Sequence, residues 1–285
     1  MKNLSILPSL RSCAFIFAAV LVPAATTHAQ KLLLSYDFNE ASPTYSSSGA
    51  VKAKLKGKGS EQKAGEPGSG VSGDSKDRAW DASAGTVQAF DPESKAINRS
   101  ALAHDKDENG IDNLGAMTLV FWFNADQALS SAANRFVFNA NSTTKPTHGF
   151  YIRAVSRAGG GRRSYALEFA PGQNGAETKP IVSQYFTPGT GYAKVGEWVF
   201  VAMTWNGGRV DFYVGDRNTP AKPAGSGVFS GPLGDEKQAL VIGNTGANNR
   251  GFDGKLDNFR LYDAALSPVA IEALRTADVA GKPAS

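Results

Sequence analysis

The stretch GEWVFVAMTWNGGRVDFYVGD, residues 196–216, carries two apolar runs on either side of a turn sequence. The first run spans Trp198 to Trp205, and the second spans Val210 to Val214. Asn206-Gly207-Gly208 between them accepts the positive φ angles that a tight hairpin turn requires. The stretch therefore predicts a β-hairpin whose alternate side chains line one wall of an apolar core.

Further strand candidates surround this hairpin at short intervals, because 31 glycines and 14 prolines punctuate the chain. The most apolar is Met117–Phe123, which is hydrophobic on both faces, as a central strand covered on both sides should be. The others are predicted at 32–38, 51–56, 78–81, 86–90, 135–140, 150–155, 164–169, 181–186, 240–242 and 256–262. The predicted class is all-β.

Only the tail of the chain is expected to be helical. Ser267 is a suitable N-cap, and Pro268 suits the first turn of a helix. An apolar side is expected from Val269, Ile271 and Leu274. The sequence therefore predicts a short C-terminal helix packed against the strands.

The first 29 residues have the pattern of an export signal. Lys2 and Arg11 precede an apolar run from Cys13 to Ala25, and small residues stand at the cleavage positions up to Ala29. This run is shorter than the about 20 residues that span a bilayer, so no transmembrane segment is expected in the mature chain. We expect cleavage after Ala29, which leaves residues 30–285 as one domain that is secreted or held in the periplasm or cell envelope.

Cysteine content and charge exclude several classes of function. Cleavage would remove Cys13, the single cysteine, so neither a disulfide nor a thiol nucleophile is expected. Two of the 30 basic residues and none of the 26 acidic ones lie in the signal, which leaves 28 against 26 and a net charge of +2. This near balance gives no reason to expect nucleic acid as a partner.

Three segments, in this order and spacing, resemble the laminin-G-like jelly-roll family of the concanavalin A-like lectin and glucanase superfamily. They are MTLVFWFNAD (117–126), the hairpin at 196–216, and VIGNTGANNRGFDGKLDNFRLYDAALSPVAIEAL (241–274). With LSYDFNE (34–40) near the start, the resemblance covers nearly the whole mature chain. It implies a two-sheet antiparallel jelly-roll sandwich with a short C-terminal helix, in which the last strand lies beside the first.

The resemblance also implies a metal site. In related folds an aspartate at the position of Asp257 often helps to hold a structural calcium ion, and Asp37 is the matching candidate in the first strand. Calcium takes about six to eight oxygen ligands, so both aspartates with loop carbonyls would suffice. Strict alternation would place Asp257 on the face of Phe259, where a carboxylate needs a partner. In the alternative interpretation, backbone amides, Arg260 or Lys255 satisfy this carboxylate; no other cofactor is expected.

Two other motifs have weaker contexts. Asp105–Gly110 fits the front half of an EF-hand loop, but position 12 would be Ala116 rather than glutamate, so a polar turn is favoured over an isolated calcium loop. Gly68-x-Gly70-x-x-Gly73 matches the dinucleotide fingerprint, yet it follows no apolar strand and opens no helix. We therefore predict no phosphate site at this string.

No catalytic set is recognisable in the sequence. Related folds include glycan-cleaving enzymes with Glu-x-Asp-x-x-Glu on one strand, which sets two carboxyl groups about 5 Å apart. No such string occurs here, and Glu168 stands alone on its predicted strand. The mature chain has only His104 and His148, and it has no Gly-x-Ser-x-Gly nucleophile motif. A polysaccharide-cleaving enzyme with an unrecognised site stays an alternative, as does a purely structural envelope component.

The expected function is therefore that of a secreted, non-catalytic domain that binds a carbohydrate or an extracellular protein surface. Aromatic rings on a sheet can stack on sugar rings, although most aromatics at alternating strand positions belong to the core. The candidates for stacking are Trp122, Tyr151, Tyr165, Tyr185 and Phe186. A local basic patch is formed by Arg153, Arg157, Arg162 and Arg163, where a solvated hairpin tip is favoured over an acidic-glycan site. The sequence leaves the ligand's identity and the oligomeric state open.

Overall fold

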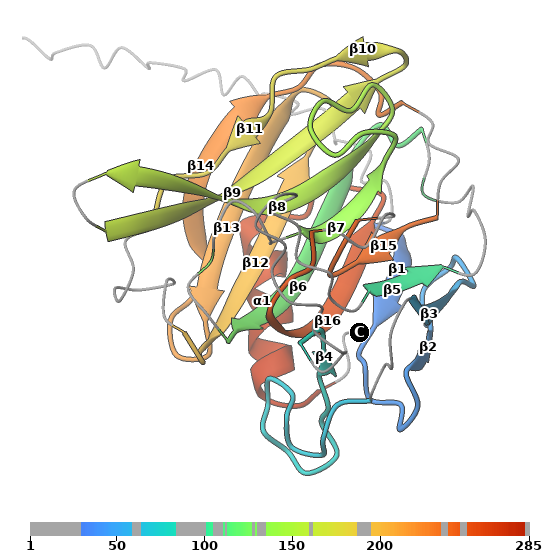
Figure 1. The fold of residues 1–285 in the computed structure, drawn as a ribbon, viewed down its shortest axis with the longest axis vertical. Helices are drawn as coiled ribbons and strands as arrows, with labels where there is room; N and C mark the ends of the chain where they lie inside the picture. Colours follow the sequence, from blue (N-terminus) through green and yellow to red (C-terminus); the bar gives the residue numbers. More distant parts are fainter. Residues whose placement is uncertain are drawn as a thin grey trace, which may run out of the picture.

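The computed structural model describes residues 30–58, 64–83, 101–104, 111, 113–126, 129, 135–159, 162–186, 195–234, 239–245 and 250–282. The export signal predicted at 1–29, the strand predicted at 86–90 and the calcium-loop string at 105–110 lie outside the described residues. The described strands form two antiparallel sheets that pack face to face (Figure 1). The predicted fold class, an all-β jelly-roll sandwich with a short C-terminal helix, is confirmed.

One sheet has seven strands and contains the hairpin at 196–216. Its order is β1 (Leu32–Tyr36), β16 (Gly254–Tyr262), β6 (Met117–Ala125), β12 (Trp198–Trp205), β13 (Arg209–Asp216) and β14 (Lys222–Val228), and β4 (Trp80–Asp81) pairs with β16. The first and last strands are neighbours, as expected, with Tyr36 opposite Phe259 and Ser35 opposite Arg260.

The other sheet has nine strands. Its order is β10 (Ala176–Glu177), β9 (Arg162–Gln173), β8 (Gly149–Gly159), β7 (Arg135–Ala140), β15 (Val241–Ile242), β5 (Ala101–His104), β3 (Lys54–Lys58) and β2 (Thr44–Ser46), and β11 (Ile181–Val182) pairs with β9. The strands β8 and β9 form the longest hairpin of this sheet, with Tyr151 opposite Ala170 and Arg153 opposite Glu168.

The main core lies between the two sheets, and β6 shows why the sequence folds this way. Phe121 and Phe123 point into this core, where they contact Phe136 of β7. Trp122 points to the opposite face and packs against Phe200 of β12 in a second apolar cluster. Both hydrophobic faces predicted for this strand are therefore buried, one in the main core and one in the second apolar cluster.

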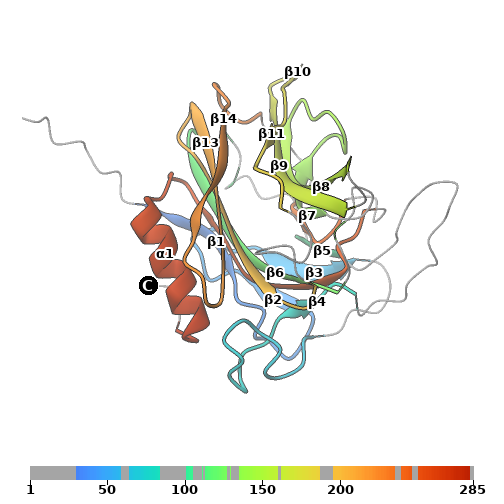
Figure 2. The same cartoon turned by 90° about the vertical axis from the view of Figure 1, so that its left-hand side faces the viewer.

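The helix α1 (Pro268–Val279) covers the outer face of the seven-stranded sheet (Figure 2). Ser267 caps it as predicted, since its side chain accepts a hydrogen bond from the Ala270 amide. Ile271 is fully buried against the second apolar cluster. The prediction that Val269 shares this apolar side is wrong, because Val269 is 80% exposed. Val269 and Ile271 are two positions apart, so their side chains point in directions that differ by about 200° around the helix axis.

Membrane insertion by a helix finds no support in the described residues. The helix α1 has 12 residues, and no helix in the described ranges is long and apolar enough to cross a bilayer.

Candidate functional site

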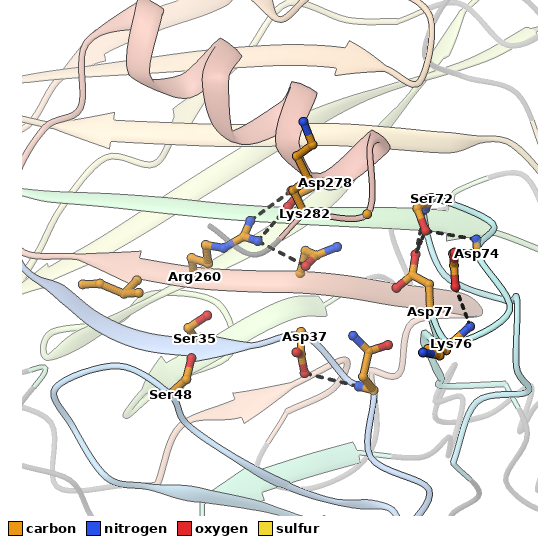
Figure 3. A pocket seen from close by; sticks show the side chains of 14 residues that line it. Ser35, Asp37, Ser48, Ser72, Asp74, Lys76, Asp77, Arg260, Asp278 and Lys282 are labelled. Carbon is orange, nitrogen blue, oxygen red and sulfur yellow. Dashed lines mark hydrogen bonds and ion pairs between the residues drawn. The ribbon is translucent and has the colours of Figure 1, made fainter. Parts of the chain in front are cut away.

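A pocket of about 400 Å³ lies on the outer face of the seven-stranded sheet, at its β1 edge. Its floor is formed by β1 and β16, and its walls are formed by the loop 66–78 and the C-terminal end of α1 (Figure 3). We call it the β1/β16 pocket. The charged and amide side chains that line it are Asp37, Asn39, Asp74, Lys76, Asp77, Asn258, Arg260, Asp278 and Lys282.

A β-bulge in β16 shapes the floor of this pocket. Asn258 has a φ of 49°, and the pairing of β16 with β6 shifts register between Asp257 and Arg260. As a result Leu256 and Phe259 both belong to the main core, whereas Arg260 faces outward. The prediction that Asp257 shares a face with Phe259 and Leu261 is therefore wrong, because strict alternation ends at the bulge.

Asp257 is fully buried beneath the loop 66–78. Its Oδ2 accepts a hydrogen bond from the Val71 amide at 2.9 Å, and its Oδ1 accepts one from the Asn258 amide at 2.7 Å. Burial, and then the nearby charge of Asp77, raise the pKa of Asp257 well above its ordinary value. The sequence suggested backbone amides, Arg260 or Lys255 as partners of this carboxylate, and the structure shows hydrogen bonds from backbone amides.

The Gly68-x-Gly70-x-x-Gly73 string forms a turn, and no helix follows it. Its amides bind carboxylates of the chain itself: the Ser72 amide donates to Asp77 Oδ2 at 2.7 Å, beside the bond from Val71. The loop therefore uses these amides to bind carboxylates of the chain itself, and it fixes one wall of the pocket.

Asp37 follows directly after β1 and lies exposed in the pocket, where its Oδ1 accepts a bond from the Asn39 amide at 3.3 Å. The next residue, Phe38, is buried in the core with a φ of 54°, a conformation that bulky side chains seldom adopt. Backbone strain of this kind concentrates at functional sites. Two strained residues, Phe38 and Asn258, therefore flank the pocket floor.

The calcium hypothesis depends on Asp37 and Asp257. Within the described ranges no three histidine, cysteine, aspartate or glutamate side chains gather closely enough to hold a metal ion. A calcium ion at this edge would have to draw most of its oxygen ligands from backbone carbonyls and water. The site stays a prediction.

An ion pair closes the back of the pocket. Arg260 donates to both carboxylate oxygens of Asp278 on α1, at 2.9 and 2.6 Å, and to Asn258 Oδ1 at 3.2 Å. The Trp122 Nε1 also donates to Asp278, at 2.8 Å. Burial by itself would lower the pKa of Arg260, but the charge and hydrogen bonds of Asp278 raise it above its ordinary value. The sequence prediction missed Asp278, although it lies seven residues after Ile271, on the same helix face.

The accessible groups of the pocket are polar and of both signs. Asp37, Asn39, Asp74, Lys76 and Lys282 are exposed and present carboxylate, amide and ammonium groups. No aromatic side chain is among the residues that line this pocket. The arrangement can accept and donate several hydrogen bonds at once, which suits a ligand rich in hydroxyl groups.

The aromatic residues predicted to stack on sugars have other positions. Trp122, Tyr151, Tyr165 and Phe186 are between 0 and 7% exposed, and only Tyr185, at 43%, is accessible among these five. Of the predicted basic patch, Arg153 forms an ion pair with Glu168. The side chains of Arg157, Arg162 and Arg163 lie outside the part of the structure that is described.

The chain is similar to known proteins in both sequence and fold. The chain matches, over residues 99–272, the model of the family described as the concanavalin A-like lectin/glucanases superfamily. No curated protein matches the chain.

Three solved structures resemble the fold. The receptor-binding domain of the botulinum neurotoxin C/D mosaic serotype is 11% identical, with a TM-score of 0.52 over 86% of this chain and 51% of that chain. A structure from work on ganglioside-dependent cell entry of botulinum neurotoxin type C is 13% identical, with a TM-score of 0.50 over 87% and 51%. Domain 4 of AbnA, an extracellular GH43 arabinanase of Geobacillus stearothermophilus in complex with arabinotriose, is 16% identical, with a TM-score of 0.48 over 86% and 98%. The chain thus spans about half the length of the toxin structures.

Proposed function

This chain belongs to the concanavalin A-like lectin/glucanases superfamily, and from that premise we propose that it is a secreted, non-catalytic domain that binds a carbohydrate in the β1/β16 pocket. The observation that carries the proposal is the chemistry of the pocket. Exposed carboxylate, amide and ammonium groups converge on about 400 Å³ of space above a rigid sheet. That volume falls within the range of about 300 to 1,000 Å³ that small-ligand sites occupy.

The rigidity of the floor supports the same proposal. The positions of Asn258 and Arg260 are fixed by the β-bulge and by the buried ion pair with Asp278. A ligand that meets preformed partners loses less free energy in ordering them. The botulinum neurotoxin type C structure, which shares this fold, comes from work on an interaction with two ganglioside molecules, so the fold is compatible with glycan recognition.

Localisation and calcium complete the proposal. The export pattern at residues 1–29 supports release from the cytoplasm into the periplasm, the envelope or the medium. Calcium, if it binds beside Asp37, would stiffen the pocket floor and add a partner for sugar hydroxyl groups.

A binding experiment with matched variants tests the proposal. The mature protein would be titrated by calorimetry with a panel of neutral and acidic oligosaccharides. Asp37→Asn removes a charge in the pocket, and Asp211→Asn removes one from β13, where Asp211 pairs with Arg209. We expect D37N to weaken binding by about tenfold, the scale of one lost hydrogen bond to a charged group, and D211N to bind like the wild type.

Two results would contradict the proposal. One is that no oligosaccharide in the panel binds the wild type, or that D37N and D211N bind equally well. The other is the release of reducing ends from any of these oligosaccharides, which would identify the alternative, a polysaccharide-cleaving enzyme.

A further inference from the structure

The outer face of the nine-stranded sheet carries a charged cluster that the β1/β16 pocket does not use. It consists of Arg135 at the start of β7, Tyr151 and Arg153 on β8, and Glu168 on β9, and we call it the Arg135 cluster. Arg153 Nε lies 2.5 Å from Glu168 Oε1, and the Tyr151 hydroxyl lies 3.3 Å from the same oxygen. Figure 1 shows the three strands side by side.

Both guanidinium groups lie near the ring of Tyr151. The Cζ of Arg135 is 4.1 Å from the centroid of the Tyr151 ring, and the Cζ of Arg153 is 5.3 Å from it. A cation over an aromatic face is stabilised by the ring's quadrupole. This attraction offsets part of the electrostatic repulsion between the guanidinium groups of Arg135 and Arg153.

The charges of the cluster do not balance. Glu168 is its one carboxylate, and Arg153 already pairs with it. Arg135 is 2% exposed, and it forms no ion pair with any of the described residues. Its Nε is buried without a hydrogen-bond partner, and one Nη donates to the Thr143 carbonyl. Burial, and then repulsion by Arg153, lower the pKa of Arg135 to about 9, which leaves it a cation at neutral pH.

A buried guanidinium of this kind is unusual because a charge removed from water normally gains a carboxylate or a full set of hydrogen bonds. Arg135 retains a free Nε–H edge, and a guanidinium edge matches the geometry of a carboxylate or a sulfate group. Arg250, which also acts on Arg135 electrostatically, adds further positive charge. The cluster therefore presents an unpaired guanidinium edge of the kind that binds an oxyanion.

We propose that the Arg135 cluster is a second binding site, which takes the carboxylate or sulfate group of an acidic sugar. Arg135 would hold two oxygens of this group, and Arg153 would remain paired with Glu168. The choice of a sugar as carrier of the anion rests on the proposed function. The site itself is separate from the β1/β16 pocket, which lies on the other sheet.

The loop 141–148 lies against this site. It covers the cluster through two carbonyls, since Thr143 accepts from Arg135 and Thr144 accepts from the Tyr151 hydroxyl at 3.1 Å. The loop is closed on itself by Asn141, whose Oδ1 accepts from the Thr147 amide at 3.0 Å. The loop is also tied to the β9–β10 region, by the ion pair of Lys145 with Glu177 at 2.9 Å and by the Gly175 amide, which donates to the Thr147 carbonyl at 3.0 Å. An entering anion would therefore have to displace only the Thr143 carbonyl from Arg135.

The test uses the mature protein and three probes: sodium glucuronate, glucose 6-sulfate and glucose. Calorimetric titration is expected to show binding of one or both acidic sugars and none of glucose. The acidic sugar that binds identifies the group as a carboxylate or a sulfate. Arg135→Gln is expected to weaken this binding by about tenfold or more, the scale of a lost charge-assisted interaction. Arg209→Gln is the matched control, since Arg209 is exposed on the other sheet.

The outcome remains decisive if R135Q does not fold. Arg135→Lys keeps the positive charge but lacks the planar fork, so it is expected to weaken binding too. In the wild type, glucuronate or glucose 6-sulfate should shift the NMR signal of the Arg135 Nε–H group. Absence of binding by both acidic sugars, or unchanged affinity in R135Q or R135K, would refute the second site. D37N should leave this binding unchanged, which separates failure here from failure of the proposed function.

Discussion

Asn258 illustrates what a single residue changes in this fold. Its left-handed backbone inserts the β-bulge that turns Asp257 and Arg260 to the outer face. The alternation of LDNFRLY predicts a regular strand, and a positive φ is uncommon at any single non-glycine position, although asparagine is enriched there. The sequence therefore indicated a strand at 256–262 and an aspartate in need of a partner, but it could not indicate the face on which Asp257 lies.

The carboxylate of Glu272 makes the stability of the folded protein depend on pH. Its carboxylate accepts bonds from Arg275, at 2.7 Å from Nη2, and from the Ala221 amide at 2.8 Å. The hydrogen bonds from Arg275, foremost, lower the pKa of Glu272 below its ordinary value. A depressed carboxylate pKa stabilises the folded state above the unfolded pKa of about 4.3, and this stability is lost as the pH falls through the folded pKa.

We therefore expect Glu272→Gln to reduce the free energy of unfolding by about 1 kcal/mol or less at pH 7, as for a partly exposed pair. The difference from the wild type should shrink as the pH falls below about 4. Urea unfolding of both proteins from pH 7 to pH 2.5 measures it. A difference that stays constant across this range would show that the charge of Glu272 contributes nothing.

At the scale of elements, strands with their own sequence signals were predicted well. The hairpin of β12 and β13 has its observed bounds within one or two residues of the prediction, because the turn sequence fixes the register. The strands β2, β5, β10 and β14 were not predicted. β14 has the sequence KPAGSGV, which lacks apolar alternation, and its pairing with β13 is what makes it a strand. β5 has the sequence ALAH, and it lies inside a segment that is otherwise polar.

The attachment of the helix α1 to the sheet depends on a buried ion pair. Asp278 joins it to the sheet through Arg260 and Trp122, and its side chain is fully buried. Removing one partner of a buried ion pair leaves the other charge uncompensated, which costs about 3 to 5 kcal/mol. Asp278→Ala should therefore lower the free energy of unfolding by this amount in urea titrations.

A double variant separates the ion pair from the packing of α1. Arg260→Met with Asp278→Leu replaces both charges by apolar side chains of similar volume, and such replacements are often close to neutral. We expect it to be more stable than D278A. Equal destabilisation of the two variants would mean that the uncompensated charge of Arg260 is not what destabilises D278A.

At the scale of the whole molecule, the ordered set of motifs predicted the sandwich and the adjacency of its first and last strands. The β1/β16 pocket could not be predicted. Its lining comes from β1, the loop 66–78, β16 and the end of α1, and the sequence indicated no role for the helix beyond packing. Of the two predicted metal ligands, Asp37 lines the pocket and Asp257 does not. The burial of Arg135 could not be predicted either, because an arginine at the start of a strand is normally solvated.

The calcium hypothesis is tested on the intact protein. An ion that binds only the folded state raises its stability, by about 2.7 kcal/mol at a concentration 100 times the dissociation constant. The melting temperature of the mature protein is therefore expected to be higher in millimolar calcium than with a chelator, and Asp37→Asn should remove the difference. Identical melting temperatures under both conditions would exclude Asp37 and Asp257 as calcium ligands.

The pairing of β1 with β16 also bears on how the protein is made. The Lys31 amide donates to Asp263 Oδ1 at 2.8 Å across a separation of 232 residues, so the seven-stranded sheet cannot close until residue 263 has been synthesised. Contacts of such long sequence separation slow folding, because a large loop must be ordered first. Until β16 has been synthesised, β1 therefore has no partner strand in this sheet, and β6 lacks one of its two neighbours.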